Sequence, residues 1–194
     1  MDAAGGGALL SALVPGTAVA AKGGKLDAPP KSFGKGDVGI LNYALTLEYL
    51  EAAFYNEANK NLKLKGAESQ FLAIVVKDEN AHVKYLKKAL GKAAVAEPKF
   101  DFGDAVKDEK TFLATAFVLE NTGVAAYAGQ GTNIKDPAIV QAALSIHSIE
   151  ARHAGVIGQI IKGKKGISPD GPFDTPLGAK AVLKAVDGTG FIVS

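Results

Sequence analysis

The feature that most constrains the fold of this chain is a Glu-x-x-His pair that occurs twice, at Glu79/His82 and at Glu150/His153. The sequence of 194 residues contains three histidines, and two of them lie in this spacing. Residues three apart on an α-helix are neighbours on one face, so each pair can present a carboxylate oxygen and an imidazole nitrogen to one metal ion. Each pair therefore predicts a helix that faces a metal site.

A lone glutamate, preceded by leucine in an apolar stretch, lies before each pair, at Glu48 and at Glu120. A four-helix bundle with these residues facing inward would hold four carboxylates and two imidazoles, a donor set that binds two metal ions. Four buried carboxylates without cations would be strongly unfavourable, and two divalent ions remove that problem. We expect the lone glutamates to complete or bridge the metal pair. The predicted metal ligands are Glu48, Glu79, His82, Glu120, Glu150 and His153.

The intervals between these residues indicate an internal repeat. The lone glutamate precedes its Glu-x-x-His pair by 31 residues in the first half and by 30 in the second, and the two lone glutamates are 72 residues apart. Tyr55 and Tyr127 each follow a lone glutamate by seven residues, which is about two helical turns. The chain therefore reads as two helix pairs related by a pseudo-twofold axis.

Several stretches resemble the ferritin-like superfamily, and most closely its secreted ferritin-like domain proteins, which include desiccation-related proteins. These stretches are ALTLEYLEAAFYNEA, KDENAHVKYL, FVLENTGVAAYAG, SIEARHAGVI and PFDTPLGAKAVLKAV. The resemblance covers about residues 36–192 and implies an all-α, ferritin-like four-helix bundle with a di-iron or di-manganese site at the six predicted ligands. The chain has no Cys, so it lacks the cysteine-containing, rubredoxin-like segment that rubrerythrins carry. Its Gly- and Pro-rich C-terminal region does not resemble the short fifth helix of cage-forming ferritins. Both departures argue against cage storage and rubredoxin-coupled peroxidase activity.

Helical periodicity and turn residues predict the position of each element. Asp37 is expected to cap the first helix, and Asp136-Pro137 to start the fourth. Phe100 and Phe102 are expected to pin a long crossover between the second and third helices to the bundle. A short C-terminal helix is expected to start at Thr175-Pro176. The predicted domains are residues 1–36, an export-signal-like segment and linker; 37–163, the bundle; and 164–194, a loop, short helix and tail.

The N-terminal segment resembles an export signal. The apolar run Ala8 to Val14 is followed by Pro15 and small residues at 18–21, as around a signal-peptide cleavage site. No basic residue precedes Lys22, and the sequence AAGGGALLSAL resembles the part of a twin-arginine signal just after the arginines. We therefore expect the gene product to begin upstream of Met1. The run is shorter than the roughly 20 residues of a membrane span. We predict export to the periplasm, envelope or extracellular space, or a cytoplasmic location if the segment is not a signal.

Composition excludes several kinds of chemistry. A net charge of +2 gives no signature of nucleic-acid binding. A chain without Cys cannot form disulfides, zinc–thiolate sites or a cysteine nucleophile. The sequence also has no nucleophile elbow.

Other polar residues are candidates for supporting roles. Tyr55 and Tyr127 are expected to hydrogen-bond the site carboxylates, with radical chemistry as the alternative. Glu51 competes with Glu48 as the ligand of the first helix, and it either faces outward or lies behind the ligands. Asp78 could orient a histidine of another helix.

Two residues near the second pair have open roles. His147 lies three residues before Glu150 and is an extra ligand, a proton carrier or an ordinary helix residue. Arg152 is expected to form a surface or interhelix ion pair.

Two functions follow from the sequence. The first is a di-metal oxidoreductase that acts on dioxygen, peroxide or ferrous iron with two iron or manganese ions. The second is an exported, non-enzymatic stress-protection bundle in which the metal site is stabilising or vacant. A homo-oligomer assembled through the N- and C-terminal tails is expected in either case.

Overall fold

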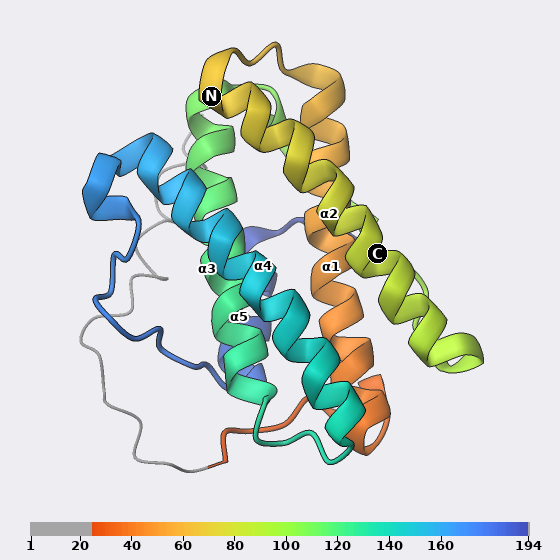
Figure 1. The fold of residues 1–194 in the computed structure, drawn as a ribbon. Helices are drawn as coiled ribbons and strands as arrows, with labels where there is room; N and C mark the ends of the chain where they lie inside the picture. Colours follow the sequence, from red (N-terminus) through yellow and green to blue (C-terminus); the bar gives the residue numbers. More distant parts are fainter. Residues whose placement is uncertain (1–24, 194) are drawn as a thin grey trace.

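The computed structural model describes residues 25–193, and in this range four long helices form one bundle (Figure 1). They are α1 (Gly36–Asn61), α2 (Gly66–Leu90), α3 (Glu109–Gln130) and α4 (Pro137–Lys162). α1 packs along α2 and α3 packs along α4, while α2 contacts α4 and α1 contacts α3 across the bundle. This arrangement confirms the predicted all-α fold with a long second-to-third connection.

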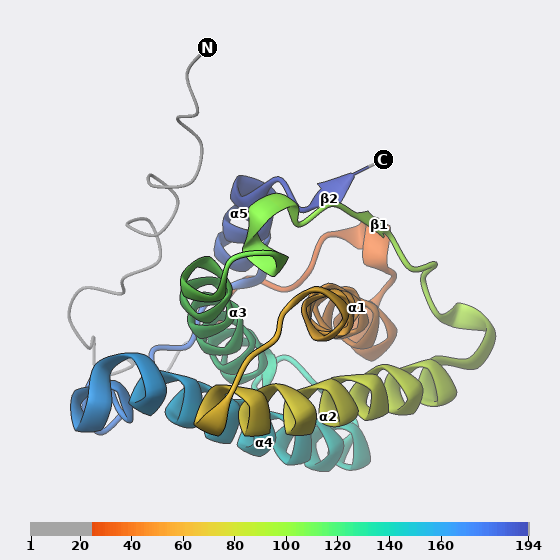
Figure 2. The same ribbon diagram turned by 90° about the horizontal axis from the view of Figure 1, so that it is seen from above.

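Helix α1 is the central helix of the molecule. Every residue from 39 to 52 is buried, because α2, α3 and the crossover with the C-terminal strand surround the helix (Figure 2). A helix enclosed on all sides must be apolar around its whole circumference, and this accounts for its nearly continuous apolar sequence. Polar residues within the run, Glu48 and Glu51, are therefore forced into the interior.

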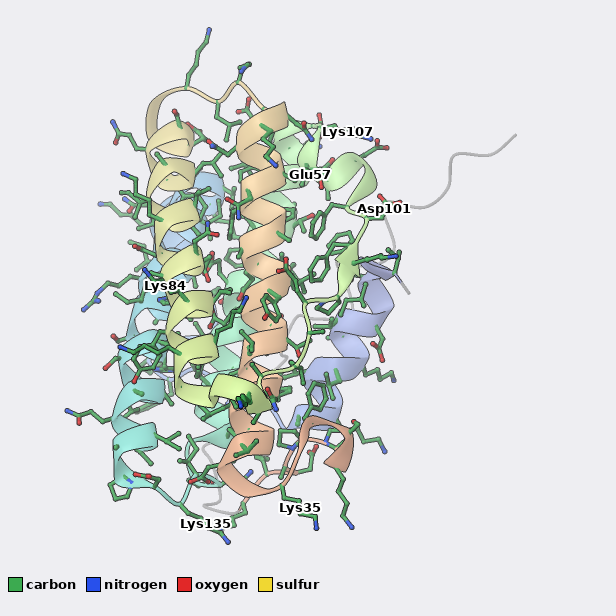
Figure 3. All side chains as sticks on the ribbon, turned by 90° about the vertical axis from the view of Figure 1, so that its right-hand side faces the viewer. Lys35, Glu57, Lys84, Asp101, Lys107 and Lys135 are labelled. Atoms are coloured by element: carbon green, nitrogen blue, oxygen red, sulfur yellow. The ribbon has the colours of Figure 1, made fainter. Side chains whose placement is uncertain are left out.

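The outer faces of the bundle carry the charged residues. Lys35, Lys84, Lys107 and Lys135 are exposed and project away from the helices (Figure 3). The scattered lysines of the sequence thus form a solvated surface.

The crossover between α2 and α3 contains the short helices η2 (Gly91–Ala93) and η3 (Gly103–Val106) and the strand β1 (Lys99–Phe100). Phe102 is buried, and its ring centroid lies 5.5 Å from that of Phe54 and 5.2 Å from that of Phe191. Phe100 stacks on Phe102 at 5.6 Å. The expected anchoring of the crossover by aromatic residues is therefore confirmed.

The C-terminal segment pairs with this crossover. Strand β2 (Ile192–Val193) runs antiparallel to β1, with Lys99 opposite Val193 and Phe100 opposite Ile192. The described part of the C-terminal tail thus packs on its own chain. Oligomerisation through the tails stays a prediction.

Helix α5 (Ala179–Thr189) confirms the short C-terminal helix but begins later than the predicted Thr175-Pro176. The Leu177 amide donates a 3.0 Å hydrogen bond to the Ala125 carbonyl, which draws the preceding chain along α3. The Lys180 amide donates to Asp27 Oδ2 at 2.6 Å, and the Ala179 amide to the Asp27 carbonyl at 3.1 Å. The helix begins where Asp27 satisfies its free amides. The remaining short helices are η1 (Lys31–Phe33) and η4 (Gly163–Gly166).

The predicted capping role of Asp37 is wrong. α1 begins at Gly36 without a side-chain cap, and the Asp37 carboxylate instead accepts the amides of Lys135 and Asp136 at 3.0 and 2.9 Å. Asp136 does cap α4, since it accepts the Ala138 amide at 2.8 Å. Asp37 therefore ties the start of α1 to the loop between α3 and α4.

The predicted export segment, at residues 1–21, lies outside the described residues and stays a prediction. Within residues 25–193, none of the helices combines the length and the apolar character needed to cross a membrane.

Candidate metal centre

The six predicted ligands converge in the middle of the bundle. All four long helices contribute, because α1 and α3 each supply a lone glutamate and α2 and α4 each supply a Glu-x-x-His pair. The four glutamates have no exposed surface, whereas His82 and His153 are 9% and 5% exposed. Of these six residues only the histidines, on α2 and α4, have any exposed surface.

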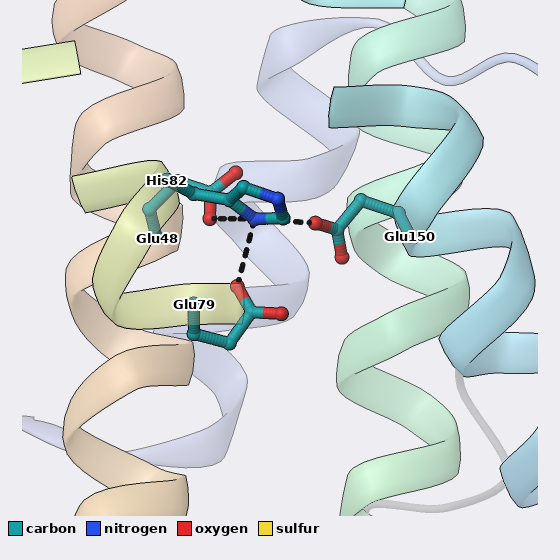
Figure 4. A group of neighbouring side chains, drawn as sticks. All are labelled: Glu48, Glu79, His82 and Glu150. Atoms are coloured by element: carbon teal, nitrogen blue, oxygen red, sulfur yellow. Dashed lines mark hydrogen bonds and ion pairs between the residues drawn. The ribbon is translucent and has the colours of Figure 1, made fainter. Parts of the chain in front are cut away.

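His82 faces three carboxylates from three helices. Its Nδ1 atom lies 3.1 Å from Glu48 Oε2, 3.1 Å from Glu150 Oε1 and 3.3 Å from Glu79 Oε2 (Figure 4). A single ring nitrogen carries at most one proton and cannot donate well to all three oxygens. Convergence of this kind is the geometry of donor atoms placed around a cation.

His153 has the matching position in the second half of the chain. Its Nδ1 atom lies 3.1 Å from Glu79 Oε1 and 3.4 Å from Glu120 Oε2. Its Nε2 atom lies 3.1 Å from Asp78 Oδ2. In a neutral His153, a proton on Nε2 would donate to Asp78 and leave the Nδ1 lone pair directed at the centre for a metal ion, as outer carboxylates commonly arrange for metal-binding histidines.

The donor atoms fall into two overlapping groups. The first comprises Glu48, Glu79, His82 and Glu150, the second comprises Glu79, Glu120, Glu150 and His153, and the ligand atoms of each group lie within 4.8 Å of one another. Glu79 and Glu150 belong to both groups. If two ions were bound, one by each group, Glu79 and Glu150 could therefore contribute donor atoms to both of them.

Many of these buried atoms make no well-aligned hydrogen bond with the described residues, although several carboxylate oxygens lie 3.1–3.4 Å from a histidine Nδ1 atom. They include Glu79 Oε1, Glu120 Oε2, both carboxylate oxygens of Glu150 and His153 Nδ1. Burial raises the pKa of Glu150 well above its usual range, and nearby carboxylates raise it further. Burial also raises the pKa of Glu79 to about 7, although its contacts with the two histidines act in the opposite direction. Unpaired buried carboxylates are strongly unfavourable, and a pair of divalent cations fits this donor set.

The surrounding carboxylates also raise the pKa values of the two histidines. Burial alone would lower the pKa of His153, but its contacts with Glu120 and Glu79 outweigh burial and raise the pKa to about 11. Contacts with Glu150, Glu48 and Glu79 likewise raise the pKa of His82 far above its usual range. In the metal-free protein both imidazoles are therefore protonated and serve as the cations of the cluster.

The two tyrosines of the repeat contact the lone glutamates crosswise. The Tyr55 hydroxyl donates to Glu120 Oε1 and the Tyr127 hydroxyl donates to Glu48 Oε1, each at 2.5 Å. Burial, together with the adjacent carboxylate, raises the pKa of each hydroxyl well above its usual range, so both remain hydrogen-bond donors. Each tyrosine thereby leaves one oxygen of its glutamate free to face the centre.

Glu51 is buried in the interior of the bundle. It does not face outward, since it is 3% exposed and its Oε1 atom has no hydrogen-bond partner among the described residues. The signal was present in the sequence, because Glu51 follows Glu48 by three residues within the apolar run of α1.

His147 and Arg152 are not brought into the centre. His147 is half-buried and belongs to neither group of donor atoms, and Arg152 is exposed on α4.

The sequence comparison places the chain in a family. Residues 36–163, which span α1 to α4, match the ferritin-like domain, and the chain belongs to this family. No curated protein matches the chain. The resemblance to ferritin-like proteins is thereby confirmed, whereas the secreted, desiccation-related subgroup has no support from the comparisons.

Proposed function

We propose that the bundle binds two iron or manganese ions and uses them for redox chemistry on dioxygen, peroxide or ferrous iron. The observation that carries the proposal is the pair of overlapping, buried donor groups that share Glu79 and Glu150.

The donor set favours this pair of metals. Each group offers three carboxylates and one imidazole, and oxygen-rich sites of this kind suit manganese and ferrous iron better than soft, thiolate-seeking metals. The four predicted carboxylate ligands also balance the charge of two divalent ions. When bound, such ions supply the electron-transfer chemistry that no side chain of this cluster provides.

The chain's own residues hold and shield the centre. Tyr55 and Tyr127 fix the carboxylates of α3 and α1, and Asp78 fixes the ring of His153. Buried apolar side chains such as Phe54 and Leu45 pack around the bundle interior and exclude water from it.

Metal content tests the first part of the proposal. The purified protein is loaded anaerobically with Fe²⁺ or with Mn²⁺, freed of excess metal, and its metal content is measured by mass spectrometry. We expect about two ions per chain, which a Glu79→Gln/Glu150→Gln variant loses. Glu97→Gln, which changes an exposed carboxylate of the crossover, should bind as the wild type does. A wild-type protein that retains no iron or manganese contradicts the proposal.

Turnover tests the second part. The loaded protein is assayed for Fe²⁺ oxidation in air and for peroxide consumption, and we expect at least one activity that the Glu79→Gln/Glu150→Gln variant lacks. A protein that binds two ions yet catalyses neither reaction contradicts the redox function. The bound metal would then only stabilise the bundle, as in the stress-protection alternative.

A further inference from the structure

Glu51 and Gly123 occupy equivalent positions in the two halves of the chain. Each follows the lone glutamate of its helix by three residues and precedes the tyrosine of its helix by four, and the two positions are 72 residues apart. The crosswise tyrosine–glutamate hydrogen bonds align α1 and α3 so that these two positions lie between them, near the pseudo-twofold axis.

The axis has room for one carboxylate and not for two. A Cβ atom at Gly123 would lie 3.3 Å from Glu150 Oε2, closer than ordinary van der Waals contact, and 3.4 Å from Glu51 Oε1, at the limit of such contact. A second glutamate at this position would place its carboxylate in the space that Glu51 occupies. The repeat is therefore broken at the axis, where α1 supplies a carboxylate and α3 supplies the space for it.

The position of Glu51 has no structural explanation within the described chain. The side chain is 3% exposed, its Oε1 atom has no hydrogen-bond partner, and it forms no ion pair among the described residues. Its carboxylate neighbour, Glu150, is itself a predicted ligand. A buried carboxylate in the neighbourhood of other buried carboxylates, as Glu51 is, is expected where a cation is to be bound.

We propose that Glu51 is a fifth carboxylate ligand of the metal pair, on the side of the centre formed by α1 and α3, and that Gly123 leaves the space in which its carboxylate reaches the metal. The inference rests on the two-metal function proposed above. Glu51 adds one negative charge beyond the four that balance two divalent ions. It should therefore favour the higher oxidation state of the bound metal, because opposite charges at close range attract strongly in a buried site.

Two variants separate the ligand from its space. Glu51→Gln keeps the size of the side chain and removes its charge, whereas Gly123→Ala keeps Glu51 and fills part of the space beside it. Their controls are Glu97→Gln, at an exposed carboxylate, and Gly155→Ala in α4, where an added Cβ would make an ordinary 3.7 Å contact. Mn²⁺ affinity is measured by calorimetry, and metal coordination is measured by the visible absorption of Co²⁺.

We expect Glu51→Gln to weaken Mn²⁺ binding by about tenfold or more, since even residues that only support a ligand change metal affinity by about 10–100-fold. Its Co²⁺ absorption should change in position and gain intensity, as it does when the coordination number falls. Gly123→Ala should move both measurements in the same direction, and both controls should match the wild type. The reduction potential of the bound iron should rise in Glu51→Gln.

The results also distinguish this inference from the function on which it rests. A wild-type protein that binds no metal overturns both. A wild-type protein that binds two ions, with Glu51→Gln unchanged in Mn²⁺ affinity and in Co²⁺ absorption, overturns the role of Glu51 alone. If Glu51→Gln does not fold, an unchanged Co²⁺ spectrum in Gly123→Ala overturns that role instead.

Discussion

The Tyr55 hydroxyl on α1 donates a 2.5 Å hydrogen bond to Glu120 on α3. The equivalent residues of the repeat make the same contact in the other direction, since the Tyr127 hydroxyl on α3 donates a 2.5 Å hydrogen bond to Glu48 on α1. Each helix of this central pair therefore carries one predicted ligand and one tyrosine that holds the ligand of the other helix. The pseudo-twofold symmetry of the sequence thus reappears as a reciprocal contact at the centre.

Removing a tyrosine hydroxyl should destabilise the protein and leave a carboxylate without its donor. We expect Tyr55→Phe to lower the free energy of unfolding of the metal-loaded protein by about 1–3 kcal/mol, the usual effect of leaving a buried polar group unpaired. Thermal unfolding of the Mn²⁺-loaded protein measures this. The control is Tyr85→Phe, at a residue 50% exposed on α2. Equal melting temperatures for the two variants would show that the buried hydrogen bond contributes nothing.

Asp78 should distinguish the two metal positions. Among residues 25–193 its carboxylate pairs with His153, and its equivalent in the repeat, 71 residues later, is Ile149, which offers no matching carboxylate to His82. We expect Asp78→Ala to weaken one of the two Mn²⁺ binding steps by about 10–100-fold and to leave the other nearly unchanged. Calorimetric titration resolves the steps, with the exposed Asp187→Ala as control. Equal weakening of both steps would contradict an action through His153 alone.

The metal-free protein should lose stability as the pH rises. Glu79, with its pKa raised from 4.5 to about 7, keeps a proton that the unfolded chain releases, so its stabilising contribution is lost as the pH passes through about 7. His153, with its pKa raised from 6.5 to about 11, acts in the same direction at higher pH. We expect the melting temperature without metal to fall between about pH 5 and pH 9.

A Glu79→Gln variant provides the control for this pH dependence. Its melting temperature without metal should change less steeply near neutral pH, because the titrating carboxylate is gone. Bound Mn²⁺ should reverse the trend, since metal ions and protons compete for the same donor atoms. A metal-free wild-type protein whose stability rises steadily with pH would contradict the assigned protonation states.

Chelation should destabilise the loaded protein. A ligand at one hundred times its dissociation constant stabilises the folded state by about 2.7 kcal/mol per site, which corresponds to about 5–10 °C for a chain of this size. We therefore expect a fall of at least that size when Mn²⁺ is removed, measured by calorimetry. The Glu79→Gln/Glu150→Gln variant should show no change on chelation. A wild-type melting temperature insensitive to chelator would argue against metal bound in the bundle interior.

The sequence was sufficient to predict what depends on helical periodicity. Glu79 and His82 share a helix face because they are three residues apart, and the repeat carried the same reasoning to the second half of the chain. Phe102 could be assigned to the core because a large aromatic side chain in a long connection is expected to bury its ring against the helices. The helix pairs and the six converging side chains followed from these local rules.

Features that depend on distant parts of the chain could not be predicted in this way. Asp37 and Asp27 satisfy amides about a hundred residues or more away, so neither partner is visible in the local sequence. The β1–β2 pair is two residues long in each strand, too short to produce an alternating pattern. The alternative in which Glu51 faces outward was wrong because a helix buried on every side has no outward face, and that enclosure comes from the surrounding elements.

The most direct test of the two-metal centre is an anomalous-difference map from crystals of the Mn²⁺-loaded protein, recorded above the manganese absorption edge. We predict two peaks about 3.5–4 Å apart, the usual separation in two-metal sites. Glu79 and Glu150 should lie between the peaks, with His82 beside one and His153 beside the other. A single peak, or manganese bound only outside the four-helix interior, would contradict this prediction.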